Sequence, residues 1–332
     1  MSAESIAILG AGSWGTALAL TAARNGHRVV LWGHNAQHMA DMAASCCNSR
    51  YLPDTPLPES LTLTADLASA VAGADFLLLA VPSHAFRATL ERLHAFHTAG
   101  TTIAWATKGL DPDSGGLLQQ TVAEVFSPDT AMALLSGPTF AREVAQGLPT
   151  AITLAANQPV FAERLARIFH SPTFRVYTSS DLIGAQLGGA VKNVLAIAAG
   201  ISDGLGYGAN TRAALVTRGL AEMMRLGQAL GAHSETLMGL AGLGDLVLTC
   251  TDNQSRNRRM GLALGQNQTQ AEALAGIGQE VEGVAAAREV YRLAQCHGVE
   301  MPITEQVYHV LHEGLAPEAA VYNLLNREPK AE

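Results

Sequence analysis

The chain has 332 residues, which is long enough for about two domains that each bury a core. Hydrophobic residues make up 48% and charged residues 15% of the chain, a composition that fits a folded globular protein and excludes an intrinsically disordered one. The net charge of -8 argues against general binding to nucleic acid or to an anionic membrane, so any bound anion needs a local basic site.

The N-terminal residues 1–10 contain no basic segment followed by a cleavable apolar stretch, so we expect no signal peptide there. The four cysteines form no CxxC pair, and neither they nor the histidines have the spacing of metal ligands. We therefore expect free thiols, no bound metal and a reducing, cytoplasmic location.

Seven apolar runs in the first 180 residues predict buried β-strands, and helical patterns separate several of them. Nearly continuous apolar strands that alternate with helices are typical of a mostly parallel sheet covered on both faces. The strand candidates are residues 5–10, 28–32, 75–81, 101–107, 131–137, 151–156 and 174–178, and the clearest helical patterns are 14–24, 82–96 and 117–126.

The first strand candidate runs directly into GAGSWG, in which Gly10, Gly12 and Gly15 form a G-x-G-x-x-G pattern ahead of a helix. In dinucleotide-binding proteins the first glycine permits a tight turn, the second lets the backbone approach a pyrophosphate, and the third allows close helix–strand packing. The helix N-terminus then offers free N–H groups to the phosphates. A glycine-rich structural turn is the alternative, but this position in a strand–turn–helix favours a dinucleotide site of Rossmann type.

The end of the second strand candidate bears on which dinucleotide binds. NAD sites usually place an Asp or Glu about 20 residues further on, bonded to the ribose 2′-OH. Here no acidic residue occurs between Glu4 and Asp41, whereas the basic residues His34 and Arg50 follow the strand. This pattern suits a 2′-phosphate and favours NADPH, with NADH as the alternative, although either side chain alone could equally be a plain surface residue.

Two later strand candidates also end in residues with possible functions. Lys108 follows the run at 101–107, and Ser136 to Thr139 end the run at 131–137. Doubly wound sheets bind ligands at the carboxyl ends of their strands. We therefore expect these residues to share one cleft.

After Ser180 the strand-like runs stop, and helical patterns follow at residues 181–201, 211–231, 256–265, 282–298, 302–313 and 317–326. The chain is therefore predicted to form an α/β domain, residues 1–179, followed by an all-helical domain, residues 180–332. We find no internal repeat, low-complexity tract or linker.

The first of these helices carries a lysine in a nearly uncharged run. From residue 182 to residue 202, Lys192 is the only charged residue, and the chain has three lysines against 18 arginines. The run fits a membrane span, a core helix whose lysine reaches to solvent, or an active-site helix with a buried amine. Gln186 and Asn193, together with the lack of a second span, argue against the membrane. The glycines and alanines on the face of Lys192 predict close approach of another helix or of a ligand.

The segment 239–261 is the second informative stretch. Asp245 stands alone among apolar and glycine residues, and Ser255, Arg256 and Asn257 follow with two more arginines. Guanidinium groups suit a phosphate or another oxyanion, because they donate two parallel hydrogen bonds. A solvated basic turn at a helix start is the alternative, but arginine there opposes the helix dipole and so favours a bound anion.

Seven motifs in order resemble those of bacterial NAD(P)-dependent glycerol-3-phosphate dehydrogenase and cover nearly the whole chain. They are GAGSWG, NSRYLPD, ATKGL, LSGPTFA, GGAVKNVLA, GLGDLVLTC and SRNRRMG. The resemblance implies a cytoplasmic, commonly dimeric oxidoreductase that reduces dihydroxyacetone phosphate to sn-glycerol 3-phosphate, the backbone precursor of phospholipids.

The same resemblance implies roles for single residues. Lys192 resembles the general acid/base of the family, and Asp245 is expected to orient it. The implied substrate contacts are Lys108, Gly137, Thr139, Lys192, Asp245, Ser255, Arg256 and Asn257. The implied cofactor contacts, with the glycines of the fingerprint, are Gly10, Gly12, Ser13, Trp14, Gly15, His34, Arg50, Lys108, Ala141, Arg256, Glu280 and Glu282. Relatives tend to carry an apolar residue where this chain has Glu280.

A mechanism follows from these residue types. Reduction of a ketone places negative charge on its oxygen, so a proton donor must stand beside that oxygen. We expect Lys192, with a pKa lowered by burial, to donate that proton, and Arg256 to hold the substrate phosphate. That Lys192 and Asp245 meet in space is implied by the resemblance alone.

Two rival functions remain open. A 3-hydroxyacid or 6-phosphogluconate type dehydrogenase would share the nucleotide domain, the helical domain and the lysine helix, but Trp14 and the SRNRR segment favour a phosphate-bearing ketone. A dinucleotide-sensing protein without catalysis would need the glycine fingerprint but neither Lys192 nor Asp245.

Overall fold

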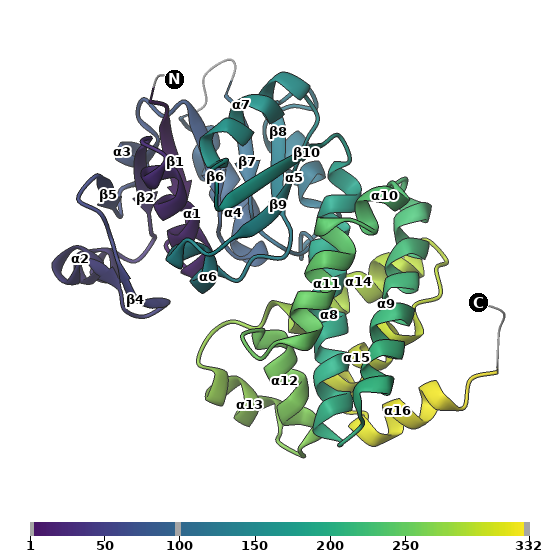
Figure 1. Ribbon diagram of the computed structural model, residues 1–332. Coiled ribbons are helices and arrows are strands. Elements are labelled where there is room, and N and C mark those ends of the chain that lie inside the picture. The colour runs from purple at the N-terminus through teal and green to yellow at the C-terminus, as the bar shows by residue number, and fades with distance from the viewer. Residues whose placement is uncertain (1–2, 97–100, 329–332) are drawn as a thin grey trace.

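An eight-stranded sheet forms the first lobe in the computed structural model, which describes residues 3–96 and 101–328 (Figure 1). The strand order is β10-β9-β8-β7-β6-β1-β2-β5, and every neighbouring pair is parallel except β8 and β9. The strands are β1 (Ser5–Leu9), β2 (Arg28–Trp32), β5 (Leu61–Thr64), β6 (Phe76–Leu79), β7 (Ile103–Trp105), β8 (Met132–Ser136), β9 (Thr150–Ala156) and β10 (Phe174–Ser179). The predicted mostly parallel sheet is confirmed. Among the strands, two features were not predicted: strand β5 and a small antiparallel pair, β3 (Cys47–Asn48) and β4 (Leu52–Pro56).

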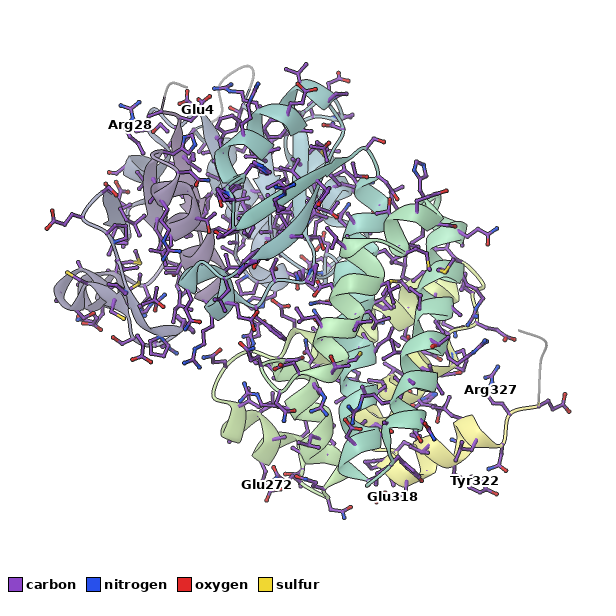
Figure 2. All side chains as sticks on the ribbon, viewed as in Figure 1. Glu4, Arg28, Glu272, Glu318, Tyr322 and Arg327 are labelled. Atoms are coloured by element: carbon purple, nitrogen blue, oxygen red, sulfur yellow. The ribbon has the colours of Figure 1, made fainter. Side chains whose placement is uncertain are left out.

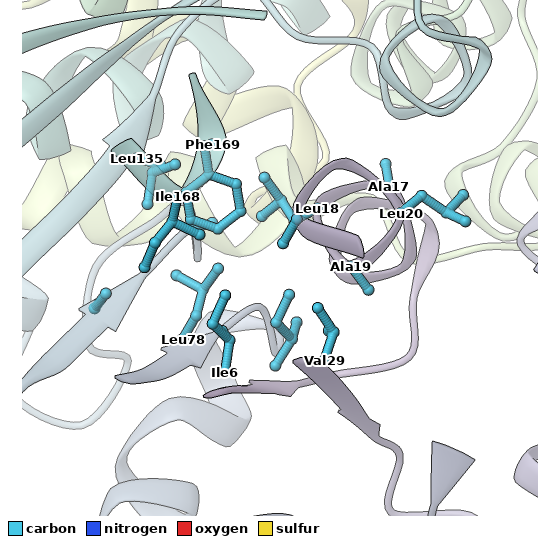
Figure 3. Close-up of a cluster of buried hydrophobic side chains, with 14 of the residues drawn as sticks. Ile6, Ala17, Leu18, Ala19, Leu20, Val29, Leu78, Leu135, Ile168 and Phe169 are labelled. Atoms are coloured by element: carbon cyan, nitrogen blue, oxygen red, sulfur yellow. The ribbon is translucent and has the colours of Figure 1, made fainter. Parts of the chain in front are cut away.

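Helices cover both faces of this sheet. Because alternate residues of a strand point to opposite faces, Ile6 lies in one buried apolar cluster and Ala7 in the other. Leu18 of α1 and Ile168 of α7 belong to the cluster around Ile6 (Figure 3), while Phe86 of α4 belongs to the opposite one. The helices of this lobe are α1 (Ser13–Arg24), α2 (Ala36–Ser45), α3 (Leu67–Val71), α4 (Ser83–His94), α5 (Leu118–Val125), α6 (Ala141–Gln146) and α7 (Pro159–Phe169).

The direction of strand addition reverses beside β1, since β2 lies on one side of it and β6 on the other. The N–H of Gly10 donates to the carbonyl of Trp32 (2.8 Å), and the N–H of Ala80 donates to the carbonyl of Leu9 (2.8 Å). Open α/β sheets bind their ligands at such a reversal, outside the carboxyl ends of the strands. The GAGSWG loop lies at this edge.

The second lobe is helical throughout the described residues that follow β10 (Figure 1). Its elements are α8 (Leu182–Gly204), α9 (Ala209–Leu230), α10 (Ser234–Leu237), a short π-helix η1 (Leu240–Gly244), α11 (Asp245–Thr251), α12 (Arg256–Gly265), α13 (Gln270–Ile277), α14 (Glu282–Cys296), α15 (Pro302–His312) and α16 (Pro317–Leu325). All six predicted helices are present. The division into domains at residue 179 stays a prediction, and it falls between the last strand and α8.

Helix α8 is the central helix of this lobe and packs against α9, α11, α12 and α14. It is the one helix of the described chain that is long and apolar enough to cross a membrane, but 94% of its most apolar window is buried inside the protein. This burial is that of a core helix.

Glycines let α8 and α12 touch backbone to backbone. A Cβ atom at Gly200 would lie 2.1 Å from the carbonyl oxygen of Arg258, and one at Gly261 would lie 2.0 Å from the carbonyl oxygen of Ile197. The close approach predicted from the small residues is therefore made here by another helix. Gly189, nearer the start of α8, instead faces the side chain of Lys108, since its Cβ would lie 3.6 Å from Cγ of that lysine.

Gly200→Ala is expected to lower the free energy of unfolding by about 1–3 kcal/mol or more, because the added methyl group forces two backbones apart. Chemical denaturation measures this change. Gly276→Ala in α13 is the matched control, because no atom of the described chain beyond its own helical turn lies within 4 Å of its Cβ position. Replacing a helical glycine by alanine stabilises by up to about 1 kcal/mol. Equal stability of Gly200→Ala and the wild type would contradict the packing described above.

Candidate active site

The glycine fingerprint has the geometry that a bound dinucleotide requires. Gly10 has a φ of +126°, and a Cβ there would lie 2.5 Å from the carbonyl oxygen of Ala80. A Cβ at Gly15 would lie 1.9 Å from the carbonyl oxygen of Gly10, whereas nothing lies within 4 Å of the Cβ position of Gly12. No side chain caps the start of α1, so its first N–H groups are free for an anion. The loop therefore fits a pyrophosphate.

Trp14, in the same loop, has a buried indole N–H with no acceptor among the described residues. Buried donors without partners are rare in folded proteins and call for an explanation, such as a bound water or ligand. Asn48 fixes the neighbouring segment, because its amide donates to the carbonyl of Ala11 (3.0 Å) and to the hydroxyl of Thr16 (2.8 Å). This anchor places Tyr51 in the wall of a cleft that is lined by residues of both lobes.

Neither of the basic residues expected near a 2′-phosphate lines this cleft. His34 is exposed after β2. Arg50 stacks on the ring of Tyr51, 5.1 Å from its centroid, and lines a separate cavity of about 280 Å³ with Asn35 and His38.

Two lysines share one buried carboxylate at the junction of the lobes. Lys192 Nζ on α8 lies 2.5 Å from Asp245 Oδ1 and donates to the hydroxyl of Thr249 at 2.9 Å. Lys108 Nζ, just after β7, lies 2.7 Å from Asp245 Oδ2 and 3.4 Å from the carbonyl oxygen of Gly137. Lys192 and Asp245, 53 positions apart in the chain, are thus in direct contact.

Burial and charge act differently on the three ionised groups. Burial lowers the pKa of Lys192 to about 8, because the loss of hydration and the repulsion from Lys108 outweigh the attraction of Asp245. Burial also opposes the charged form of Lys108, but Asp245 outweighs it and raises the pKa of Lys108. The Asp245 carboxyl, against the effect of its burial, has its pKa lowered by the two lysines. Lys192 is therefore the member of the cluster that can release its proton near neutral pH.

The start of α12 is tied to the residue that follows Lys192. Asn257 donates to the side-chain oxygen of Asn193 (2.9 Å) and accepts from the N–H of Gly283 (2.9 Å). The amide of Asn193 in turn donates to Glu282 (3.2 Å). Ser255 caps the helix by accepting from the N–H of Arg258 (3.1 Å).

The three arginines of the SRNRR segment do not serve one purpose. Arg258 turns into the protein, where it donates to the carbonyl of Cys250 (3.0 Å) and pairs with Asp203. Arg256 and Arg259 line the cleft. An anion site built from all three arginines, as the sequence pattern suggested, is therefore wrong for Arg258.

A cleft of about 240 Å³ brings half of the predicted site residues together. Those that line it are Ser13, Trp14, Lys108, Ala141, Lys192, Ser255, Arg256, Asn257 and Glu282. Asp245 lies beneath the two lysines, and Thr139 donates to the carbonyl of Gly137 (3.2 Å). Glu280 is not in the lining and instead lies 3.0 Å from Nδ1 of His84 at the start of α4.

The cleft also contains residues that sequence reasoning missed. Thr249 follows Asp245 by four positions, a spacing that puts both on one face of a helix and could have been noticed. Asn193, Tyr51 and Arg142 also line the cleft, and only the fold brings them there.

Comparison with known proteins agrees with this architecture. Residues 5–162 match the family model of the NAD-dependent glycerol-3-phosphate dehydrogenase N-terminus, and residues 181–322 match that of its C-terminus. The chain is 60% identical over 328 residues to glycerol-3-phosphate dehydrogenase [NAD(P)+] of Methylococcus capsulatus, with 98% of each chain covered. It is 57% identical to the protein of that name from Aeromonas hydrophila, again with 98% of each covered. A crystal structure of glycerol-3-phosphate dehydrogenase from Coxiella burnetii has a TM-score of 0.95 at 52% identity, covering 98% of this chain and 99% of the other.

A Rossmann-type sheet with an open glycine fingerprint, joined to a helical lobe by a buried lysine cluster, defines a dinucleotide-dependent dehydrogenase. Within that class, the chain belongs to the NAD-dependent glycerol-3-phosphate dehydrogenase family.

Asp245→Asn is expected to move the pKa of Lys192 below its value of about 8, because the substitution removes the only carboxylate that touches its ammonium group within the described chain. Nuclear magnetic resonance of protein labelled with ¹³C at lysine Cε measures this pKa, and the chain has only three lysines to resolve. Lys108 is expected to shift in the same direction. An unchanged or raised pKa of Lys192 would contradict the assigned electrostatics.

Proposed function

We propose that the protein catalyses the reversible NAD(P)H-dependent reduction of dihydroxyacetone phosphate to sn-glycerol 3-phosphate. The observation that carries the proposal is the Lys192–Asp245–Lys108 cluster, which lies in one cleft with the fingerprint loop and the start of α12. Membership of the family supports the identity of the substrate.

Lys192 acts as general acid in the direction of reduction. The dinucleotide, when bound, supplies the hydride that reaches the carbonyl carbon of the substrate. The carbonyl oxygen then takes a proton from Lys192 Nζ and becomes the hydroxyl of the product. Asp245 and Thr249 hold Nζ in place by the contacts described above.

Because Asp245 raises the pKa of Lys108, this lysine remains protonated. Its positive charge stabilises the negative charge that develops on the same oxygen. Ser255, Arg256 and Asn257 hold the phosphate of the substrate at the start of α12. An arginine suits this task, because its planar group donates two hydrogen bonds to one phosphate. Holding the phosphate positions the ketone, and such positioning can supply several kcal/mol of barrier reduction.

NADPH is the preferred dinucleotide in this proposal, with NADH as a weaker alternative. The support is the absence of any acidic residue between Glu4 and Asp41, where an NAD site places the carboxylate that binds the ribose. Residues of the fingerprint loop, with Ala141 and Glu282, would hold the dinucleotide in the cleft.

The direct test follows the absorbance of NADPH, and separately of NADH, after dihydroxyacetone phosphate is added to the purified protein. Rapid oxidation with NADPH, and slower oxidation with NADH at the same concentration, is the expected result. Oxidation of neither dinucleotide would overturn the proposed reaction. Faster oxidation of NADH would overturn the cofactor preference alone.

Lys192→Arg is expected to lower kcat by about 10²- to 10⁴-fold, because a guanidinium keeps its charge but does not release a proton. In the wild type, kcat/KM for reduction is expected to fall as the pH rises through about 8, since reduction needs protonated Lys192. In Asp245→Asn this fall should begin at lower pH. A Lys192→Arg variant with turnover close to wild type would rule out the acid/base role, provided that both proteins bind NADPH equally.

We also infer that the enzyme is a cytoplasmic homodimer whose product feeds phospholipid synthesis. A cavity of about 1050 Å³ between α8, α9, α15 and α16 supports the dimer, because its lining includes apolar residues such as Leu215, Val307 and Leu324. Nearby, Tyr322 and Leu325 of α16 are 67% and 71% exposed, and Tyr322 projects outward from that helix (Figure 2). A second copy would cover this face.

Light scattering should give twice the monomer mass for the wild type and the monomer mass for Leu325→Glu.

A further inference from the structure

The cleft holds more positive charge than the proposed roles account for. One carboxylate, Glu282, lines it against five cationic side chains: Lys108, Arg142, Lys192, Arg256 and Arg259. Asp245 pairs with the two lysines from beneath. The three arginines have no carboxylate partner within the described chain, even though the protein as a whole carries a net charge of -8. Such a local excess of positive charge suits more than one bound anion.

Arg259 is the arginine whose surroundings are most informative. Its Nε–H is buried and has no acceptor among the described residues. It follows Arg256 by three positions on α12, so both side chains lie on the same face of the helix. A buried donor without an acceptor is rare, and a phosphate oxygen is an acceptor that matches the guanidinium fork.

Position along α12 separates the two arginines. The first turn of the helix adjoins Lys192 through the hydrogen bond between Asn257 and Asn193 (2.9 Å), so an anion held there lies beside the lysine cluster. Arg259 lies about one turn further along the helix and lines the same cleft as Arg256 and as Ser13 and Trp14 of the fingerprint. That fingerprint is where the pyrophosphate of a dinucleotide binds.

We propose that Arg259 binds the pyrophosphate of the dinucleotide from the helical lobe, while Arg256 holds the phosphate of the triose. The pyrophosphate is then held from both sides, by backbone N–H groups of the first lobe and by one guanidinium of the second. Affinity for the dinucleotide therefore depends on a residue outside the Rossmann-type lobe. The inference rests on the proposed function for the identity of the two ligands.

The test measures dissociation constants of NADPH and of ADP-ribose by calorimetry, with the full chain and without triose phosphate. ADP-ribose keeps the pyrophosphate but lacks the nicotinamide. Arg259→Gln is expected to weaken both ligands by about 10- to 100-fold, the effect of losing a hydrogen bond to a charged group. At saturating NADPH, the KM for dihydroxyacetone phosphate should stay within about twofold of wild type. Arg259→Lys, which keeps the charge but loses the fork, should lie between Arg259→Gln and the wild type.

Two further variants make the comparison specific. Arg256→Gln should chiefly raise the KM for dihydroxyacetone phosphate. Arg292→Gln, an exposed position on α14, removes the same charge away from the cleft and should change neither constant. If Arg259→Gln binds NADPH and ADP-ribose as tightly as wild type, the proposal is wrong. If it also raises the KM of the triose phosphate, Arg259 belongs to the substrate site. A wild-type protein that binds ADP-ribose but does not oxidise NADPH would overturn the proposed reaction and leave the assignment of Arg259 testable.

Discussion

The organisation of the cleft depends on one buried carboxylate that two lysines share. Asp245 is 1% exposed and Lys192 is 6% exposed, and removing such ions from water costs several kcal/mol each in real proteins. Good geometry offsets that cost here, because each carboxylate oxygen takes one ammonium group and Thr249 provides another partner. Lys108 comes from the sheet lobe and Lys192 from the helical lobe, so the cluster also joins the two lobes. The buried cluster holds two positive charges and one negative charge. Of the two lysines, Lys192 is easier to deprotonate than Lys108.

Close backbone packing brings Asp245 within reach of Lys192. A Cβ at Gly188 would lie 2.2 Å from the carbonyl oxygen of Ala241 in η1, so only glycine lets η1 lie against α8 at this point. Helix α11 begins at Asp245, immediately after η1. Lys192 follows Gly188 by four positions on the same face of α8. Gly188 therefore sets the separation of Lys192 and Asp245. Its cost to helix stability, relative to alanine, is about 1 kcal/mol.

The sequence allowed the sheet and the nucleotide loop to be predicted because both are local patterns. Continuous apolar runs mark strands buried on two faces, and GAGSWG lies in the one context where its spacing is informative. Strand β5, with the sequence LTLT, was missed, since four alternating residues at a sheet edge resemble many loops. Lys192 could be singled out as the lone charge of an apolar helix. Its contact with Asp245 could not be derived from spacing, because the fold alone decides which of many distant carboxylates it meets.

The sequence also could not show which arginines of the SRNRR segment line the cleft. The sequence does not distinguish Arg258 from Arg256 and Arg259, which stand beside it. The difference comes from Asp203, 55 positions earlier on α8, which takes Arg258 into the interior and leaves the other two on the side of the cleft. His34 and Arg50 follow β2 in the sequence and were predicted to contact the cofactor, yet neither lines the cleft.

Glu280, which was predicted to contact the cofactor, can be understood in the same physical terms. Its carboxylate lies 3.0 Å from His84, and both side chains are largely exposed, at 42% and 64%. Exposed pairs of this kind contribute about 0–1 kcal/mol, so the pair has little effect on stability. Its neighbours Gln279 and Glu282 line the cleft, whereas Glu280 points to the start of α4. The negative charge of Glu280 is thus held outside the cleft and does not offset the positive charge that lines it.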